Sequence, residues 1–452
     1  MNVELSRKNT MVVGLGETGL AVVRFLRARG ANVRVNDQRD ARALGQAARE
    51  AEALGAELVL GGHPDDAFEG LDLIVVSPGV PRLEPLEQAE ARGALVISEI
   101  ELAARYIEAP IVAVTGTNGK STVTTLIGEM CQRLDRPIFV GGNLGRPMIE
   151  AIDSDATSPR GMVIVELSSF QLERVSRLKV HVAVLLNVTA DHLDRYPSFE
   201  AYAAAKARIF ERQEVDDYAV VPADAPALRD LVRGDGTVVL FGGRAGDVRV
   251  EEGVLRDVQT SLRVPVGDLR IRGSHNLSNA CAASLAARLL GVADDDIASV
   301  LRDFEGLPHR MQYVRVIDGV EYIDDSKATN VGAAVASIDG LGSTGGKVVL
   351  IAGGVDKGGS YQPLRQRMEH LGRAVVVLGD ASQLIEEAFA GSEVGFRRAS
   401  TMGDAVAQAA LLAEPGDTVL LAPACSSFDM FRSYAERGDV FQQAVASLGG
   451  TR

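Results

Sequence analysis

Residues 111–126, IVAVTGTNGKSTVTTL, decide the fold of this 452-residue chain. A short apolar run leads into a glycine-rich turn, and helix-compatible residues follow the turn. This order is typical of a phosphate-binding loop, in which glycines let backbone N–H groups point at phosphate oxygens and the following helix adds positive potential. Lys120 is placed to reach the β- and γ-phosphates of a nucleotide, and the Ser121 hydroxyl is placed to hold Mg²⁺. The usual motif has glycine where this chain has Val114, so the match is close but incomplete.

Further short apolar runs along the chain also end in small or polar residues. They occupy residues 11–16, 73–79, 162–169, 182–188, 348–354, 374–380 and 418–424. Continuous rather than alternating apolarity indicates strands buried on both faces, and hence parallel α/β sheets. Residues 235–275 alternate instead, which indicates an antiparallel edge. Ligands gather at the carboxyl ends of parallel strands, where these polar residues stand.

The spacing of these runs predicts an α/β protein with three domains. We expect a Rossmann-like domain over residues 1–105, a central P-loop ATPase-type parallel-sheet domain over residues 106–308, and a second Rossmann-like domain over residues 309–452. The first boundary precedes the turn before Pro110, and the second follows Pro308.

Charge and composition narrow the function classes. The net charge of −14 argues against nucleic acid as the main partner. The polar opening MNVELSRKNT predicts no secretory signal, and no apolar run is long enough to span a membrane. Three scattered cysteines indicate reduced thiols and a cytoplasmic protein. Only seven of the 47 basic residues are lysines, so the four in polar or glycine-rich motifs (120, 206, 327 and 357) are candidates for chemistry that arginine cannot perform.

A second glycine-rich turn, GLGETG at residues 14–19, follows the first apolar run. It fits G-x-G-x-x-G, and Asp37 ends the next strand as a dinucleotide site requires. The pattern alone favours NAD, but the same geometry serves any diphosphate, including that of UDP, and no hydride-transfer constellation accompanies it.

Acids and one lysine follow the strands of the central domain. Glu166 closes an apolar strand and is the expected second anchor for Mg²⁺. Asp191, His192 and Asp194 follow the next strand and are candidate metal or phosphate ligands. Lys206 lies fourteen residues after His192 in an Ala-rich helix, where the alternative interpretation is an ordinary surface lysine.

The second half of the chain adds polar residues in five short motifs. In GSHNLSNA (273–280), Asn276 and Asn279 are predicted to cap a helix and to donate to a nucleotide. The other four motifs are LPHR (307–310), YIDDSKATN (322–330), GGVDKGG (353–359) and PACSSFDMF (423–431). Each is compatible with an ordinary loop, but together they stand at successive strand ends of one domain and predict a binding site.

Taken jointly, these motifs resemble those of the Mur ligases, the ATP-dependent amide-forming enzymes of peptidoglycan precursor synthesis. GTNGKST, NVTADHLDR with the downstream Lys206, HNLSN and LPHR carry the resemblance, which spans about residues 10–445. GLGETG and DDSKATN are similar to the member of the family that adds D-glutamate. The resemblance implies that ATP phosphorylates the carboxylate of UDP-N-acetylmuramoyl-L-alanine and that the D-glutamate amine then displaces phosphate. It also implies a cytoplasmic monomer in cell-wall biogenesis, with these small molecules, and no nucleic acid or membrane, as partners.

The resemblance also assigns roles to individual residues. The catalytic residues would be Lys120, Glu166, His192 and Lys206. The ATP-binding residues would be Gly116, Thr117, Asn118, Gly119, Lys120, Ser121, Thr122, Asn279, Arg310, Asp325 and Lys327. The UDP-sugar would be bound by Thr18, Asp37, Arg39, Gly79 and Asn143, and D-glutamate by Thr329, Lys357, Ser427 and Tyr434. Two Mg²⁺ ions would be held by Ser121, Glu166, His192 and Lys206, with Lys206 as a carbamate.

Two residues depart from the family pattern. Tyr434 stands where relatives have phenylalanine, and Glu17 places a negative charge inside the first glycine-rich turn. Three alternatives remain open at this point: a related ligase that adds another amino acid or extends folate, an NAD-dependent oxidoreductase, and a nucleotide-hydrolysing switch. The oxidoreductase gives Lys120 no role, and the switch gives none to Thr329 or Lys357.

Overall fold

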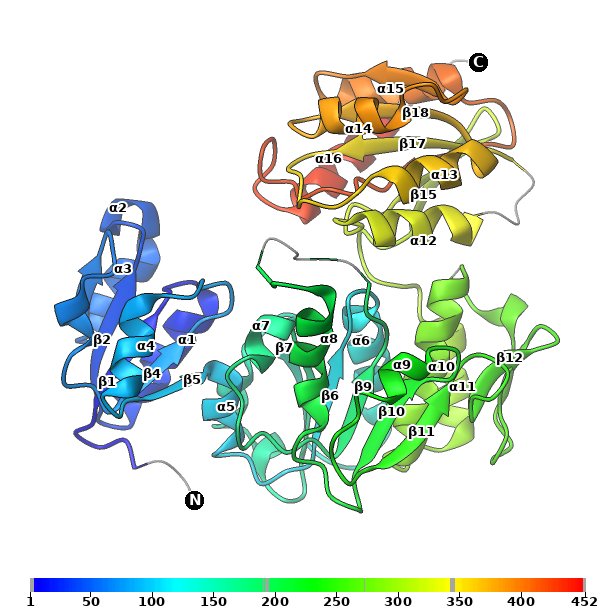
Figure 1. Cartoon of the computed structure of the whole chain (residues 1–452). Coiled ribbons are helices and arrows are strands. Elements are labelled where there is room, and N and C mark those ends of the chain that lie inside the picture. The colour runs from blue at the N-terminus through cyan, green and yellow to red at the C-terminus, as the bar shows by residue number, and fades with distance from the viewer. Residues whose placement is uncertain (1–3, 190, 192–194, 272, 342–345, 450–452) are drawn as a thin grey trace.

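The protein is described from a computed structural model that covers residues 4–189, 191, 195–271, 273–341 and 346–449. Three α/β units follow one another along the chain, each built around its own sheet (Figure 1). The three-part α/β fold predicted from the apolar runs is therefore confirmed. The boundaries at residues 105 and 308 stay a prediction, because the apolar core of the first unit continues into the central one through Ile100 and Met148.

The first sheet is parallel in the order β3-β2-β1-β4-β5. Its strands are β1 (Asn9–Val13), β2 (Asn32–Asp37), β3 (Glu57–Leu60), β4 (Leu73–Val76) and β5 (Leu95–Ser98). The helices are α1 (Glu17–Ala28), α2 (Ala41–Leu44), α3 (Gln46–Ala53), η1 (Asp65–Phe68), α4 (Glu84–Ala91) and α5 (Glu99–Ala104). Strand order reverses beside β1, so the loops after β1 and β4 open a crevice at the carboxyl edge.

The central sheet has nine strands in the order β14-β13-β12-β11-β10-β9-β6-β8-β7. They are β6 (Ile111–Thr115), β7 (Ile138–Gly142), β8 (Met162–Glu166), β9 (Val182–Leu185), β10 (Tyr218–Pro222), β11 (Thr237–Phe241), β12 (Val248–Glu251), β13 (Val254–Asp257) and β14 (Arg263–Pro265). All pairs are parallel except β12–β13 and β13–β14, which confirms the antiparallel edge predicted near residues 235–275. Every residue of β6, β8 and β9 is buried, as continuous apolarity predicted.

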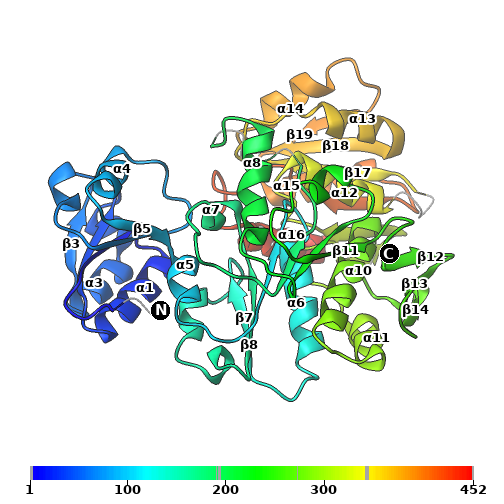
Figure 2. The same cartoon turned by 60° about the horizontal axis from the view of Figure 1, so that its bottom comes forward.

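Helices cover both faces of the central sheet (Figure 2). The longer ones are α6 (Lys120–Cys131), α8 (Phe199–Ala207), α10 (Ser274–Leu289) and α11 (Asp294–Asp303). Shorter turns are α7 (Ser169–Leu172), α9 (Pro226–Arg229), η2 (Met148–Ala151), η3 (Asp155–Thr157), η4 (Arg208–Phe210) and η5 (Val266–Asp268). Helix α6 packs against α10 and α11 in one apolar core, so the helix that follows the phosphate loop is held on both sides.

The third sheet runs β15-β16-β20-β17-β18-β19 and is parallel except for the β15–β16 hairpin. Its strands are β15 (Gln312–Ile317), β16 (Val320–Asp324), β17 (Val348–Gly353), β18 (Gly372–Leu378), β19 (Gly395–Arg398) and β20 (Thr418–Leu421). The helices are α12 (Val331–Leu341), α13 (Gln362–Leu371), α14 (Ser382–Phe389), α15 (Met402–Leu412) and α16 (Tyr434–Ser447). Helix α12 packs against α10, which places the third unit over the carboxyl edge of the central sheet (Figure 1).

Candidate active site

The loop between β6 and α6 has the glycine-dependent backbone conformation that the sequence predicted. Gly119 precedes α6 with φ of +84°, and a Cβ there would lie 2.3 Å from Oδ1 of Asn279, so only glycine fits. Two backbone N–H groups of the loop donate to Asn187, which follows strand β9. The Thr117 N–H donates to the Asn187 carbonyl at 2.9 Å, and the Asn118 N–H donates to Oδ1 of Asn187 at 2.9 Å. The loop is thus fixed before any ligand arrives.

Lys120 folds back over this loop. Its Nζ donates to the carbonyls of Gly116 at 3.0 Å and Thr117 at 2.9 Å. Burial lowers the pKa of Lys120, while the charge of Glu166 acts in the opposite direction. The ammonium lies at the mouth of the loop, bonded only to neutral carbonyls that an anionic phosphate can displace.

Ser121 and Glu166 meet, as predicted, at the carboxyl edge of two neighbouring parallel strands, β6 and β8. The Ser121 hydroxyl donates to Oε2 of Glu166 at 2.5 Å, and Asn143 donates to Oε1 at 2.8 Å. Burial alone would raise the pKa of Glu166, but Lys120 and these hydrogen bonds hold it below the usual range. Arg310, from the third unit, donates to the Ser121 hydroxyl at 2.7 Å. An ionised carboxylate and a hydroxyl on one side of a phosphate loop are the hard oxygen ligands that suit Mg²⁺.

Lys206 is buried, with 2% of its surface exposed, rather than lying on the surface. Its Nζ donates to the Gly116 carbonyl at 2.8 Å and stands 4.6 Å from the centre of the Tyr202 ring. Burial and the neighbouring Lys120 charge lower the pKa of Lys206 far below its usual value. A lowered pKa increases the fraction of the amine that is neutral and therefore nucleophilic.

The candidate metal set is incomplete in the structure. His192 and Asp194 lie outside the described residues, while Asp191 accepts from Asn330 Nδ2 at 3.0 Å. Within the part of the chain that is described, no group of three His, Cys, Asp or Glu residues is arranged to hold a metal ion. Of the three predicted ligands that the structure describes, Ser121 and Glu166 are in direct contact, whereas Lys206 donates to the phosphate loop.

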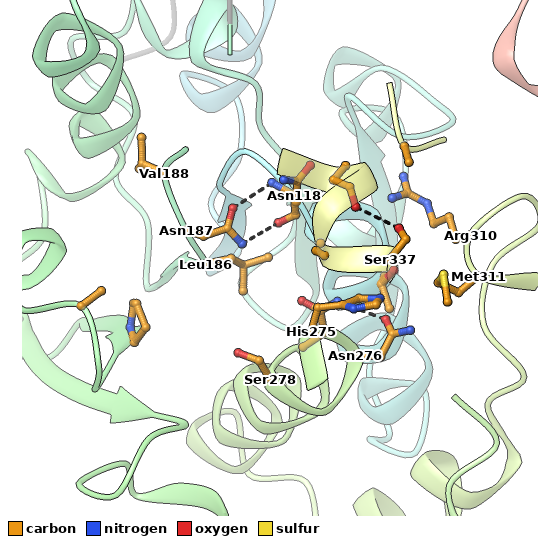
Figure 3. Close-up of a pocket in the computed structure, with 18 of the residues that line it drawn as sticks. Asn118, Leu186, Asn187, Val188, His275, Asn276, Ser278, Arg310, Met311 and Ser337 are labelled. Carbon is orange, nitrogen blue, oxygen red and sulfur yellow. Dashed lines mark hydrogen bonds between the residues drawn. The ribbon is translucent and has the colours of Figure 1, made fainter. Parts of the chain in front are cut away.

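A cavity of about 480 Å³ opens beside the phosphate loop, between the central and third units (Figure 3). Its lining contains predicted ATP-binding residues from both units: Asn118, Gly119, Thr122, Asn279, Arg310, Asp325 and Lys327. In Figure 3, Asn118 and Asn187 are joined by two hydrogen bonds, while Asn276 lies below them on α10 and Arg310 lies to the right. The cavity is the natural place for the base and ribose of a nucleotide whose phosphates rest on the loop.

The capping role predicted for Asn276 and Asn279 is wrong. Helix α10 begins at Ser274 after Gly273, and no side chain caps it. Asn276 is already inside the first turn, and Asn279 donates to Asn276 Oδ1 at 3.3 Å. Both residues instead line the cavity.

The loop after β16 brings a buried acid, Asp325, and a half-buried amine, Lys327, to the cavity. Burial raises the pKa of Asp325 to about 6, partly offset by the hydroxyl of Ser337, which donates to its carboxylate. Burial also lowers the pKa of Lys327 to about 8, and the charge of Arg310 lowers it further. Lys327 lies 3.9 Å from the centre of the Tyr434 ring. Cations gathered this closely favour the binding of an anion between them.

The predicted D-glutamate residues lie on neighbouring loops of the third unit. Lys357 Nζ and Thr329 Oγ1 are 3.4 Å apart. Ser427 is buried in the loop after β20, and Tyr434 begins α16. Lys327 touches the Tyr434 ring, so the tyrosine is near the site.

The first glycine-rich turn lines a separate cavity of about 550 Å³. The lining includes all five residues predicted to hold the UDP-sugar: Thr18, Asp37, Arg39, Gly79 and Asn143. Asp37 accepts from the Leu15 N–H at 2.7 Å and from the Arg39 guanidinium at 2.8 and 3.0 Å. Burial would raise the pKa of Asp37, but these partners lower it to about 2. Glu17 begins α1 on the exposed rim of this cavity.

Asn143 connects the cavity of about 550 Å³, called the first cavity from here on, with the phosphate loop. It lines that cavity, and its side chain donates to Glu166 beside the loop. Sequence reasoning missed other residues here. His63 and Gln171 line the first cavity, and no motif marked them. Asn330 donates to Asp191 and, at 3.5 Å, to Asn118, which ties the third unit to the phosphate loop. Its place directly after Thr329 in YIDDSKATN was the available signal.

Comparisons with known proteins agree with this geometry. Three family models match: Mur ligase MurD-like, N-terminal domain over residues 8–98; Mur ligase middle domain over residues 114–287; and Mur ligase, glutamate ligase domain over residues 309–425. UDP-N-acetylmuramoylalanine–D-glutamate ligases are 46% identical in Geobacter metallireducens and 45% identical in Desulfosudis oleivorans. Each alignment covers 99% of this chain, and covers 99% and 98% of those relatives respectively. The chain belongs to the Mur ligase family.

Solved structures show the same fold at low identity. MurF ligase from Thermotoga maritima in complex with ADP aligns with a TM-score of 0.63 at 19% identity, over 99% of this chain and 100% of that one. UDP-N-acetylmuramate-alanine ligase MurC from the same organism aligns at 0.61, with 19% identity, over 98% and 100%. Among the described residues, no helix is long and apolar enough to cross a membrane.

Proposed function

We propose that this protein is an ATP-dependent ligase that adds D-glutamate to UDP-N-acetylmuramoyl-L-alanine, through an acyl phosphate, in peptidoglycan precursor synthesis. The relatives at 45–46% identity over nearly the whole chain carry that activity in their names. The observation that carries the proposal is the junction at Ser121, where Arg310 of the third unit reaches the Ser121–Glu166 pair and Asn143 joins that pair to the first cavity. Three substrates can therefore meet at one place.

ATP would rest on the loop of Gly116, Thr117, Asn118, Gly119, Lys120, Ser121 and Thr122, with its base in the cavity beside Asn279. Burial lowers the pKa of Lys120 and of Lys327, and the nearby charge of Arg310 lowers both further, so the three cations lie close together. This cationic cluster offsets the repulsion between the γ-phosphate and the substrate carboxylate, the main obstacle to the first step.

Mg²⁺ fits the oxygen pair of Ser121 and Glu166, and its chemistry there would be to neutralise phosphate charge. We propose His192 and Lys206 as ligands of a second ion. Lys206 is buried with a strongly lowered pKa, which suits a neutral amine that takes up CO₂ as a carbamate.

In the first step, a carboxylate oxygen of the L-alanyl group attacks the γ-phosphorus and ADP leaves. Lys120 and Arg310 hold the phosphoryl oxygens during this transfer. In the second step, the D-glutamate amine attacks the acyl carbon, the tetrahedral intermediate collapses, and phosphate leaves with the oxygen that came from the carboxylate. The amine must lose a proton to form the amide, and the phosphate that departs is a suitable acceptor.

The two ends of the active site would hold the other substrates. Thr18, Asp37, Arg39, Gly79 and Asn143 would bind the UDP-sugar in the first cavity, where Asp37 is already bonded to Arg39. Thr329, Lys357, Ser427 and Tyr434 would bind D-glutamate, and the Lys357 ammonium suits a carboxylate. We further propose domain boundaries at residues 105 and 308, a monomer, and a cytoplasmic location.

Phosphate release from Mg-ATP tests the proposal. UDP-N-acetylmuramoyl-L-alanine is supplied with D-glutamate, L-glutamate, L-lysine or no amino acid, and the nucleotide product is weighed by mass spectrometry. Release with D-glutamate alone, matched by the mass of the D-glutamyl product, is expected. Release with another amino acid would retain the ligase chemistry and refute the D-glutamate specificity. Release without an acceptor would favour the nucleotide-hydrolysing switch. A further assay replaces the UDP-sugar with a folate substrate, and release in that assay alone would favour the folate-extending ligase.

A further inference from the structure

Arg437 on α16 is the largest fully buried side chain among the described residues, with 1% of its surface exposed. Its guanidinium donates five hydrogen bonds, and none of the acceptors is a carboxylate. Among the residues that the structure describes, no Asp or Glu oxygen lies within 4.0 Å of it as an ion-pair partner. The charges of Asp429 and Asp324 act on the guanidinium, but neither carboxylate is hydrogen-bonded to it. The five hydrogen bonds to neutral oxygens therefore carry much of the compensation for burying this cation.

The five acceptors stand at the carboxyl ends of three neighbouring strands, β16, β20 and β17. Nε and one terminal nitrogen donate to the Ser326 hydroxyl at 3.0 Å and the Ser326 carbonyl at 2.9 Å. The other terminal nitrogen faces the carbonyls of Cys425 at 3.1 Å, Ser426 at 3.3 Å and Gly353 at 3.4 Å. One planar side chain thereby joins the loops that follow all three strands.

These loops are the ones that carry the proposed D-glutamate residues. Thr329 follows Ser326, Lys357 follows Gly353, and Ser427 follows Ser426 directly. The Ser326 hydroxyl, which accepts from Arg437, donates in turn to the Tyr434 carbonyl at 2.7 Å. Each of the four proposed D-glutamate residues is therefore at most four positions along the chain from a residue that is hydrogen-bonded in this network.

The loops also contact one another around the guanidinium. Val355 and Ser426 exchange two backbone hydrogen bonds of 2.9 and 3.0 Å. A Cβ on Gly354 would lie 2.0 Å from the Ser426 carbonyl, so the two loops are as close as backbones permit. Burial lowers the pKa of Arg437 to about 10, which leaves it charged at neutral pH.

We propose that Arg437 is a positioning residue for the D-glutamate site: it fixes the spacing of Thr329, Lys357, Ser427 and Tyr434 from behind and adds positive potential where a dicarboxylate binds. The inference rests on the proposed function. Arginine suits the task because its fork reaches several carbonyls in one plane, whereas lysine offers a single point charge. The low dielectric around the guanidinium extends its effect on a bound anion.

Steady-state kinetics of Arg437→Met and Arg437→Lys test this role, with the KM measured for each of the three substrates. Arg437→Met is expected to raise the KM for D-glutamate about tenfold or more, the scale typical of losing a group that supports a ligand-binding residue. The KM values for ATP and the UDP-sugar are expected to stay within about twofold. Arg437→Lys, which keeps the charge and loses the fork, is expected to lie between the wild type and Arg437→Met.

Arg373→Met is the matched control. Arg373 belongs to the same sheet but stands at the amino end of β18, where it pairs with Asp417 at 3.2 Å and Glu414 at 2.8 Å. Its loss is expected to lower the melting temperature and leave the KM for D-glutamate unchanged. If either Arg437 variant fails to fold, Ser326→Ala tests the same network without removing the buried charge, and a selective rise in the KM for D-glutamate is again expected.

Two results would overturn the inference. One is an unchanged KM for D-glutamate in the folded variants, and the other is an equal rise in all three KM values, which a general loss of structure would produce. Failure of the proposed function would look different, because the wild-type protein itself would then show no phosphate release that depends on D-glutamate.

Discussion

The protein contains two glycine-rich turns of the same outline, and they differ in what stands behind them. The turn after β1 is held by Asp37, which accepts from the Leu15 N–H, and Glu17 opens its helix. The turn after β6 carries Lys120 at the start of its helix and has Glu166 and Lys206 beneath it. We propose that both turns bind a diphosphate, but only the second has the charges to promote transfer of a phosphoryl group. Backbone shape thus indicates phosphate binding, and the surrounding charges distinguish binding from chemistry.

Removal of Lys120 is expected to have the largest effect. Lys120→Ala should lower kcat by at least about 100-fold, because it deletes a cation that stabilises the transferring phosphate. UDP-sugar binding, measured by calorimetry, should be unchanged, since the first turn is untouched. Near-normal turnover of the variant would contradict the claim that the charges at the second turn promote phosphoryl transfer.

Substitution of Lys206 tests whether the site at the second turn depends on a carbamate, the anion that forms when the lysine amine takes up CO₂. Lys206→Ala is expected to lower kcat on the order of 10- to 100-fold, as loss of a metal ligand or its support does. Added formate or acetate should restore part of the activity by entering the space that is left. Lys120→Ala serves as the control, because a small carboxylate cannot replace a cation. Equal lack of rescue in both variants would count against a carbamate on Lys206.

A pair of alanine substitutions, one in each turn, tests directly whether the two turns bind different substrates. A Cβ on Gly119 would lie 2.3 Å from Asn279 Oδ1, and a Cβ on Gly19 would lie 2.0 Å from the Gly14 carbonyl. Each clash should cost about 1–3 kcal/mol locally. Gly119→Ala is expected to raise the KM for ATP alone, and Gly19→Ala the KM for the UDP-sugar alone. Crossed effects would show that the turns do not serve separate substrates.

The smallest effect concerns the acid behind the first turn. The folded pKa of Asp37, about 2, lies below its ordinary value of 3.8, so the ionised form stabilises the fold. That stability is fully present above pH 4 and disappears as the pH falls through about 2. Urea unfolding should therefore show wild type more stable than Asp37→Asn by about 1 kcal/mol at pH 7, with the gap closing in acid. A gap independent of pH would contradict this sign.

The sequence predicted the parts of the structure that are determined locally. The continuous apolar runs predicted the buried strands, and the glycine spacing predicted the phosphate loop with Lys120, Ser121 and Glu166 around it. The prediction that Asn276 and Asn279 cap a helix is wrong because α10 begins at Ser274, so both residues already lie inside the helix, where they line the cavity.

Other features depend on how the three units meet. No local pattern shows that Arg310 reaches Ser121, that Asn143 joins two cavities, or that Asn330 touches the phosphate loop. The burial of two cationic side chains was also not predictable from local sequence. The pattern around Lys206 is typical of a surface residue in an Ala-rich helix, and that around Arg437 is typical of an exposed charge on a terminal helix. Long-range packing determines both, so neither spacing nor composition reveals them.

Transfer of ¹⁸O tests the central claim most directly, because it follows the atom that the acyl phosphate must pass on. The wild-type protein is given UDP-N-acetylmuramoyl-L-alanine labelled with ¹⁸O in its carboxylate, together with Mg-ATP and D-glutamate, and the released phosphate is weighed by mass spectrometry. The mechanism predicts one ¹⁸O atom in each phosphate released. Unlabelled phosphate would mean that water, rather than the substrate carboxylate, attacks the γ-phosphorus, and would contradict the ligase mechanism.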